Sequence, residues 1–427
     1  MKSFKRITAV ILCLCLMFSV SGIAFARETQ PAAYETALSL PGEESYPYVL
    51  VHGMMGWGEN NEGQSESAYW GMLSDKPIAE ILREKGYEVA VPTVAPMGSA
   101  WDRACELFAQ LCGTVVDYGK AHSEAHNHER FGRDYTGKAL LGENGWDVKT
   151  PINLVTHSFG GPTGYVFTSM LEYGVKEEAE ASTEDCSELF KGGHGGLVYS
   201  MTTLESPHNG SPVANLINDG FFPLLLAAVA MNISGSGKEV KTDFMVDQFG
   251  LTTPPSSGER AKFSLKNCWQ LATSKDHCGQ DMTLDGAKAL YEKFKVPSQT
   301  YLFSSAANAT ETNKLGLTVP SNFSAKNILS YTVSLVIALS GLPINRGRIP
   351  GREWAANDGL VPVISALHPF GQKAVEYDEN AELETGVWYV LPVVENANHG
   401  YGMAGTEEKL EGIWDSILTR VENISSK

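Results

Sequence analysis

Short runs of consecutive apolar residues alternate with amphipathic segments along most of the 427-residue chain. The apolar runs are too short for helices, and they predict strands at 46–51, 151–156, 196–204, 300–306 and 386–394. Segment 77–94 predicts a helix, a glycine stop and a strand, and segment 161–174 predicts a helix. Buried strands that alternate with helices predict an α/β fold with a mostly parallel sheet covered by helices on both faces.

Two apolar segments do not fit a plain alternation of strands and helices. One lies within residues 207–251 and contains "GFFPLLLAAVAM" at 220–231; the other is 327–343. Both fall short of the about 20 apolar residues that a membrane span requires. Each predicts either a core helix or an apolar cover over a pocket, and the first favours the cover.

The N-terminal residues have the pattern of a secretory leader. Residues 1–26 combine a basic head, an apolar middle and small residues at Ala24 and Ala26. This pattern predicts cleavage after Ala26 and a secreted, extracellular protein, because the apolar part is too short for a permanent membrane anchor. Residues 27–45 are then an N-terminal segment, and 46–427 form one enlarged domain.

The charge balance is acidic, with 33 basic and 50 acidic residues and a formal net charge of −17. No basic stripe interrupts it, so nucleic acid and anionic membranes are excluded as partners. The odd number of cysteines after residue 26 excludes a complete disulfide framework. Cys105 and Cys112 lie about 10 Å apart on a predicted helix, too far to bridge. Cys268 and Cys278 either pair as a local loop or remain free.

The stretch "NLVTHSFGG" at 153–161 places Ser158 between an apolar strand and paired glycines that precede a helix. A hydrolase nucleophile occupies such a tight strand-to-helix turn, with small residues two positions before and after it. Thr156 fills the first of these positions and is larger than glycine. Taken alone, the stretch predicts either a nucleophile or an ordinary serine at a strand end.

A second stretch, "VLVHGMMGWG" at 49–58, places His52 and Gly53 directly after the first strand. In hydrolases this position supplies one backbone N–H of the oxyanion hole, and the residue after the nucleophile supplies the other. Met54 and Phe159 are therefore the predicted donors. The alternative is a glycine-rich turn without a ligand; a phosphate loop is excluded because the Gly-Lys-Ser/Thr ending is absent.

The remaining catalytic groups must follow the serine in the order acid, then histidine. His399 lies in "ENANHGYG" after the last predicted strand and fits the general base. Asp358, in "WAANDGLV", lies between serine and histidine, although an aspartate before glycine is more often a turn residue. His157 is not the base, because neighbours on a strand point to opposite faces.

Together these stretches resemble the secreted lipases of the thermophilic Bacillus/Geobacillus type, which are related to the staphylococcal lipases. The most specific piece is residues 101–135, and "SPHNGSP" at 206–212 and "DFMVDQFGL" at 243–251 also resemble segments of that family. The serine motif of the family begins with alanine, so Thr156 is a mild departure from it.

The resemblance implies an α/β-hydrolase fold and triacylglycerol lipase activity, with Ser158, Asp358 and His399 as the catalytic triad. It also implies a lid near residues 211–236. The expected partner is an acylglycerol ester at a lipid–water interface, and the expected state is a monomer. Two alternatives remain: a soluble carboxylesterase that acts on short-chain esters, and a catalytically dead hydrolase-like protein that binds a surface.

A group of metal-binding residue types lies in the stretch with the strongest resemblance. Asp102, His122, His126 and His128 carry the carboxylate and imidazole groups that zinc prefers. Their spacing alone leaves zinc and solvated histidines equally open.

The resemblance assigns the zinc ligands to Asp102, His122, His128 and Asp247, with His126 outside the set. Four protein ligands make a closed, structural site. Zinc would then tie an insertion at 98–135 to the far end of the lid region. The family's calcium site draws acidic ligands from the stretch after the catalytic histidine, and here 399–406 contains no Asp or Glu. Because calcium prefers carboxylates, we expect this calcium site to be lost or altered.

Overall fold

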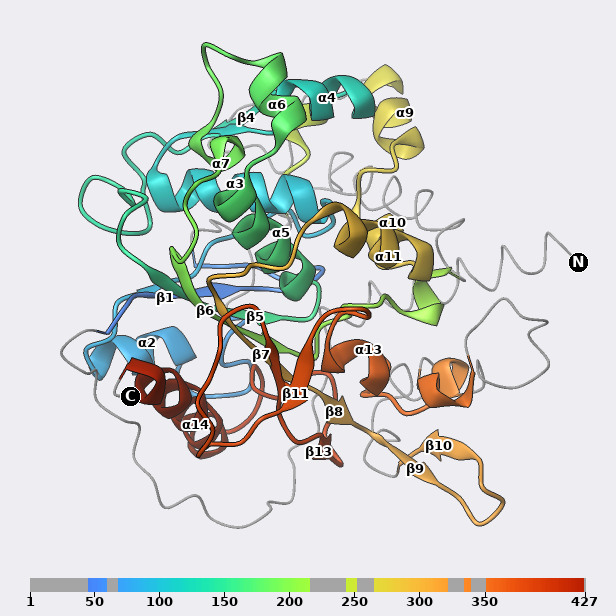
Figure 1. Cartoon of the computed structure of the whole chain (residues 1–427). Coiled ribbons are helices and arrows are strands. Elements are labelled where there is room, and N and C mark those ends of the chain that lie inside the picture. Colours follow the sequence, from blue (N-terminus) through green and yellow to red (C-terminus); the bar gives the residue numbers. More distant parts are fainter. Residues whose placement is uncertain are drawn as a thin grey trace, which may run out of the picture.

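The computed structural model describes residues 45–59, 68–215, 243–251, 265–321, 334–338 and 351–425. At its centre is a seven-stranded sheet with the order β11-β12-β7-β6-β5-β1-β2 (Figure 1). Every neighbouring pair in this sheet is parallel. The sheet confirms the α/β fold predicted from the alternation of apolar runs and helices, because parallel neighbours require crossover connections.

The strands lie close to their predicted positions, although the last is shorter than its apolar run. The central sheet consists of β1 (Tyr48–Val51), β2 (Val89–Ala90), β5 (Ile152–His157), β6 (Val198–Leu204), β7 (Tyr301–Ser305), β11 (Ala374–Glu376) and β12 (Trp388–Val390). Three small pairs are β3 (Val115–Asp117) with β4 (Phe131–Asp134), β8 (Ala307–Asn308) with β13 (Val394–Glu395), and β9 (Thr310–Thr312) with β10 (Thr318–Pro320).

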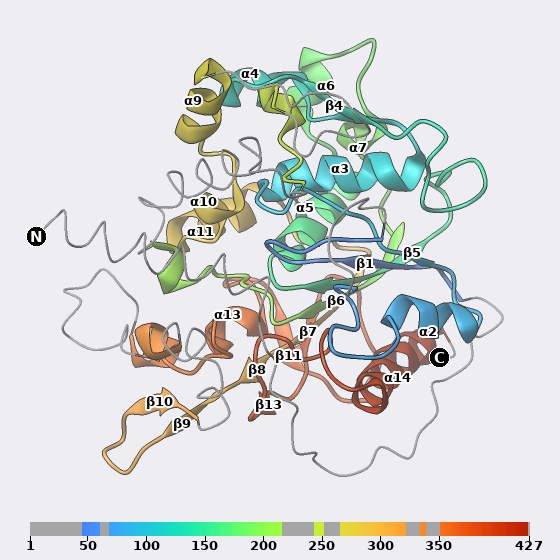
Figure 2. The same cartoon turned by 180° about the vertical axis from the view of Figure 1, so that it is seen from behind.

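Helices cover both faces of the sheet (Figures 1 and 2). One face is covered by α3 (Ala100–Cys112), α4 (Lys120–His126), α5 (Gly160–Tyr173), α6 (Lys176–Ala181), α7 (Glu188–Lys191), α9 (Leu265–Thr273), α10 (Cys278–Asp281) and α11 (Leu284–Lys293). The opposite face carries α2 (Ile78–Glu84) and α14 (Glu407–Ser425). Further helical elements among the described residues include the short α13 (Val363–Leu367), η1 (Asp247–Phe249) and η5 (Arg352–Trp354).

The alternation of side chains along β1 shows how the two layers are held. Val49 and Val51 join the hydrophobic core formed with α3 and α5. Tyr48 and Leu50 point the other way and pack in the core formed with α2 and α14. Because successive side chains of a strand face opposite sides, both faces of this sheet must be apolar, as its continuous apolar runs predict.

Several predictions from the sequence lie outside the described residues. These are the leader at 1–26, nearly all of the segment 27–45, and 216–242 of the predicted lid region. In the second apolar segment, 334–338 is helical, and Ile337 is buried. Cys105 and Cys278 are buried free thiols. Among the described helices, none combines the length and the apolar character needed to cross a membrane.

Candidate catalytic centre and metal cluster

Ser158 lies on a sharp turn between the end of β5 and the start of α5. Its φ angle is +55°, in the left-handed region that side chains rarely adopt. The glycines that follow are required by close packing, because a Cβ on Gly160 would lie 2.3 Å from the Val51 carbonyl oxygen. A Cβ on Gly161 would lie 2.3 Å from Ser206 Oγ. The turn therefore has the strained geometry that exposes a nucleophile at a strand end.

Thr156, the residue that departs from the common serine motif, is fully buried. Its methyl group packs against Gly164 on the first turns of α5, where a Cβ would lie 2.9 Å from Thr156 Cγ2. The absence of a side chain at Gly164 thus makes room for the larger residue before the nucleophile. Nothing in the local spacing of the motif reveals this compensation.

Ser158, His399 and Asp358 are joined by hydrogen bonds although they lie far apart in the sequence. His399 Nε2 is 2.8 Å from Ser158 Oγ, and His399 Nδ1 is 2.8 Å from Asp358 Oδ2. Asp358 is 1% exposed, and its second oxygen accepts hydrogen bonds from the N–H groups of Leu360 and Val361. These bonds hold the carboxylate so that Oδ2 faces the imidazole, the arrangement that a serine nucleophile requires.

The loop after β1 approaches this serine closely. A Cβ on Gly53 would lie 2.7 Å from Ser158 Cβ, so only glycine permits the contact. Within the residues that the structure describes, the N–H groups of Met54 and Phe159 have no hydrogen-bond partner. The two predicted donors are thus unpaired amides close to Ser158, the kind of group that an oxyanion hole uses.

The buried Arg103 of α3 braces the same loop. Its guanidinium donates to the carbonyl oxygen of His52 and, at 3.0 Å, to that of Ala95. It also lies 5.3 Å from the centre of the Phe159 ring. Burial lowers the pKa of Arg103 to about 10, so it remains charged at neutral pH. This cation therefore contacts both the loop after β1 and Phe159, the residue that follows the serine.

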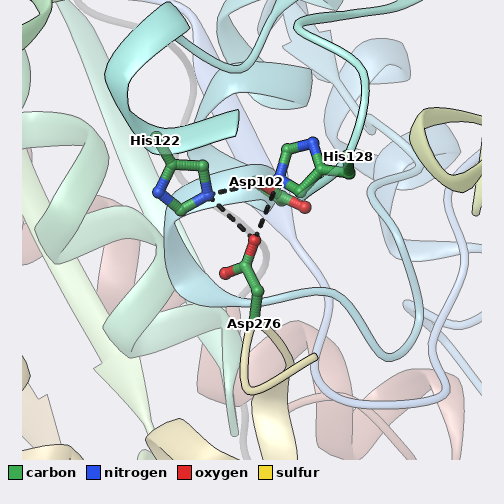
Figure 3. Close-up of side chains that lie close together, drawn as sticks. All are labelled: Asp102, His122, His128 and Asp276. Carbon is green, nitrogen blue, oxygen red and sulfur yellow. Dashed lines mark hydrogen bonds and ion pairs between the residues drawn. The ribbon is translucent and has the colours of Figure 1, made fainter. Parts of the chain in front are cut away.

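A second cluster of titratable groups lies between α3, α4 and the connection from α9 to α10 (Figure 3). It consists of Asp102, His122, His128 and Asp276, and one ligand atom from each lies within 4.8 Å of all the others. His122 Nε2 is 3.2 Å from Asp102 Oδ1 and 2.8 Å from Asp276 Oδ2. His128 Nε2 is 3.3 Å from the same Asp276 oxygen. Two nitrogens and two oxygens converging in this way form a zinc-type donor set.

In the absence of a cation, the two carboxylates of this cluster favour protonation of its histidines. Burial lowers the pKa of His122, but the adjacent carboxylates of Asp276 and Asp102 outweigh it and raise this pKa to about 9. Burial likewise opposes protonation of His128, yet Asp276 and Asp102 raise its pKa. A divalent ion would supply the positive charge that the two buried carboxylates otherwise draw from protons.

Neighbouring groups hold the cluster residues in position. The Trp101 ring stacks on the His122 ring with 4.5 Å between their centres. Gln248 Nε2 donates to Asp102 Oδ2 at 2.9 Å, and His128 Nδ1 lies 2.9 Å from the carbonyl oxygen of Glu129. These contacts leave the second nitrogen of His128 directed at the cluster, as expected for an oriented metal ligand.

The structure corrects one of the predicted ligands. Asp247 is not part of the cluster; its Oδ2 instead accepts a hydrogen bond from Arg133 Nε at 2.7 Å. Asp276 takes the fourth position. Asp247 lies on η1, next to Gln248, so the predicted segment does reach the cluster but contributes an amide to its periphery. His126 lies outside the ligand set, with its ring 4.4 Å from that of His122.

Sequence reasoning missed Asp276 because no spacing connects it to the histidines. It lies in "SKDHCGQD" at 274–281, far along the chain from His122. The sequence offers only the signal of a carboxylate directly before a histidine, His277. Only the packing of the loop before α10 against α3 brings Asp276 to Asp102.

Comparisons with known proteins agree with this architecture. Residues 44–410 match a family model described as "Lipase-like, C-terminal domain". A lipase of Staphylococcus epidermidis is 34% identical over 395 residues, which cover 89% of this chain and 54% of that relative. The chain thus spans about half the length of the curated relatives it matches.

Two solved structures resemble most of the chain. The crystal structure of Staphylococcus hyicus lipase has a TM-score of 0.74 at 27% identity, covering 93% of this chain and 100% of the other. Lipase 1 from Pelosinus fermentans has a TM-score of 0.70 at 32% identity, covering 88% and 98%. The seven-stranded parallel sheet with its covering helices is therefore that of an α/β-hydrolase fold.

Proposed function

Because this chain belongs to the bacterial lipase family that includes the staphylococcal enzymes, we propose that it hydrolyses the carboxylic esters of triacylglycerols. The observation that carries this proposal is the hydrogen-bonded series Ser158–His399–Asp358 on a strained strand-to-helix turn. The predicted leader supports a secreted enzyme, and the acidic net charge of −17 favours neutral substrates over anionic membranes.

The reaction begins at Ser158. His399 Nε2 accepts the hydroxyl proton while Ser158 Oγ attacks the ester carbonyl carbon. Asp358 holds the Nδ1 proton of His399 and stabilises the imidazolium that forms. His399 then gives its proton to the departing alcohol oxygen, and the acyl group remains on Ser158 as an ester.

Water completes the cycle. His399 takes a proton from water, the hydroxide attacks the acyl carbon, and the proton returns to Ser158 Oγ as the fatty acid leaves. In both halves negative charge develops on the carbonyl oxygen. The unpaired N–H groups of Met54 and Phe159 are the proposed donors to this oxygen, and loss of one such donor typically costs about 3 kcal/mol of transition-state stabilisation.

Zinc is the ion that fits the second cluster best, with Asp102, His122, His128 and Asp276 as its ligands. The bound ion would contribute structural stability, because four protein ligands leave no open coordination position. These residues join α3 to α4 and to the α9–α10 connection, so the ion would tie together segments that are distant in sequence.

Activity against emulsified triolein and trioctanoin tests the proposal, with p-nitrophenyl butyrate as the soluble comparison. We expect hydrolysis of both triglycerides and none by Ser158→Ala. Cleavage of the soluble ester alone would identify a carboxylesterase. A fluorophosphonate probe should label wild type and not Ser158→Ala; failure to label wild type would exclude a serine hydrolase.

A further inference from the structure

A continuous series of buried hydrogen bonds runs behind the nucleophile, from the loop after β1 to the loop that carries His399. The N–H of Gly53 donates to Tyr69 Oη at 3.0 Å. Tyr69 Oη lies 2.5 Å from His157 Nδ1, and His157 Nε2 lies 2.6 Å from the carbonyl oxygen of His399. Tyr69 and His157 are 7% and 2% exposed. The series thus connects the predicted oxyanion loop with the backbone of the proposed general base.

The two ends of this series fix the position of every proton in it. The Gly53 amide can only donate, and the His399 carbonyl can only accept. His157 therefore carries its proton on Nε2, and its bare Nδ1 accepts the hydroxyl proton of Tyr69. This arrangement exists only with neutral His157, because a protonated ring would leave Tyr69 without an acceptor.

The surroundings of His157 keep it neutral. Among the described residues, the titratable groups that face it are Tyr69, His399, Glu205 and His52. Burial and then the nearby His399 lower the pKa of His157 well below its usual range.

Glu205, which follows β6, is the one acid among these groups. Its Oε2 lies 3.9 Å from His157 Nε2 and has no hydrogen-bond partner in the described part of the chain. Burial and then Asp358 raise the pKa of Glu205 well above its usual range, which favours the uncharged carboxyl. An uncharged neighbour does not draw a proton onto His157, and the direction of the hydrogen bonds is preserved.

We propose that Tyr69 and His157 are positioning residues for ester hydrolysis, and that their hydrogen bonds fix the distance between the oxyanion loop and His399. Ser158 lies between these two elements, with its Cβ against Gly53 and its Oγ bonded to His399. A fixed separation keeps the oxyanion donors and the general base at the correct distance and orientation relative to one attacking oxygen. The inference rests on the proposed function, because it assigns His399 and the loop of Met54 their catalytic roles.

Tyr69→Phe tests the series by removing one hydroxyl while retaining the ring that packs on Trp57 and Trp70. We expect kcat for p-nitrophenyl butyrate to fall by about ten- to a hundredfold with KM within twofold, because substrate contacts are unchanged while alignment is lost. Tyr87→Phe is the matched control, since it removes a hydroxyl that donates to Glu422 in the same hydrophobic core. That control should keep kcat within twofold of wild type.

A second pair of variants separates positioning from packing. His157→Gln retains an N–H donor near the His399 carbonyl, whereas His157→Leu retains only bulk. We expect the glutamine variant to exceed the leucine variant in kcat by about tenfold, the equivalent of one hydrogen bond. This pair gives an answer even if Tyr69→Phe fails to fold.

Equal kcat in the two His157 variants, or wild-type kcat in folded Tyr69→Phe, would overturn the positioning role. An inactive, unlabelled wild type would instead overturn the proposed function itself, so the two failures are distinguishable.

Discussion

The proposed catalytic centre and the candidate metal cluster are both built from histidines and carboxylates, but they balance charge in different ways. In the catalytic centre one carboxylate, Asp358, faces one imidazole, and backbone N–H groups satisfy its second oxygen. In the cluster two buried carboxylates share two imidazoles, and the pKa of His122 rises to about 9 in response. In the first site, protein groups alone satisfy the carboxylate, whereas in the second a bound cation would balance the two carboxylates. The first should therefore govern turnover and the second stability.

The largest effect that separates the two regions should come from Asp358→Asn. The amide would donate to His399 Nδ1 and place the imidazole proton on the nitrogen that faces Ser158, so kcat should fall by about 10⁴-fold. The melting temperature should stay close to that of wild type, because the amide oxygen can still accept from Leu360 and Val361. Turnover of p-nitrophenyl butyrate and a thermal melt measure both quantities. A loss of less than tenfold would show that another acid orients His399.

Removal of the metal should have the opposite effect to Asp358→Asn: the melting temperature should fall, and turnover should stay nearly unchanged. An ion present at 1,000 times its Kd stabilises the folded state by about 4 kcal/mol, and its removal from a domain of this size should lower the melting temperature by roughly 5 °C. Activity at 25 °C should change by less than about twofold, since no step of the proposed reaction involves the ion. Scanning calorimetry with dipicolinate, followed by added zinc, measures the shift and its reversal. An unchanged melting temperature would refute the structural role.

A smaller, more specific effect distinguishes Asp276 from Asp247. Asp276→Asn removes a ligand and should weaken zinc binding by at least about 100-fold. Asp247→Asn should leave zinc affinity within twofold, because Asp247 contacts Arg133 and not the cluster. Competition titration with a zinc-selective dye provides the affinities. If Asp247→Asn weakened binding as strongly as Asp276→Asn, the sequence-based assignment would be restored.

A last effect, which depends on pH, concerns Glu106, a buried acid on the same helix as Asp102. Burial, together with Asp102, raises the pKa of Glu106 from 4.5 to about 8. The folded chain therefore keeps this proton between these pH values while the unfolded chain has lost it, so stability falls as pH rises by about 1.4 kcal/mol per pH unit. Glu106→Gln should lack this component. Urea unfolding of both proteins at pH 5 to 8 tests the difference in slope; identical slopes would mean that Glu106 is ionised and belongs with the charged cluster.

The two regions also differ in how far the sequence predicted them. The fold requires the serine, acid and histidine in a set order, and Ser158 and His399 both follow recognisable strands, so the three residues could be selected without a structure. Asp276 could not, because its place in the cluster depends on the packing of one helix connection against α3. The same is true of Tyr69, whose contact with His157 joins segments without any common motif.

The positive φ angle of Ser158 bears on which residue selection favours at this position. A side chain at φ +55° costs of the order of 1 kcal/mol relative to glycine, which adopts that angle freely. Ser158→Gly should therefore fold at least as stably as wild type while it catalyses nothing. Selection for a stable fold alone would favour glycine at this turn. Selection for turnover therefore retains a serine that costs the fold about 1 kcal/mol of stability.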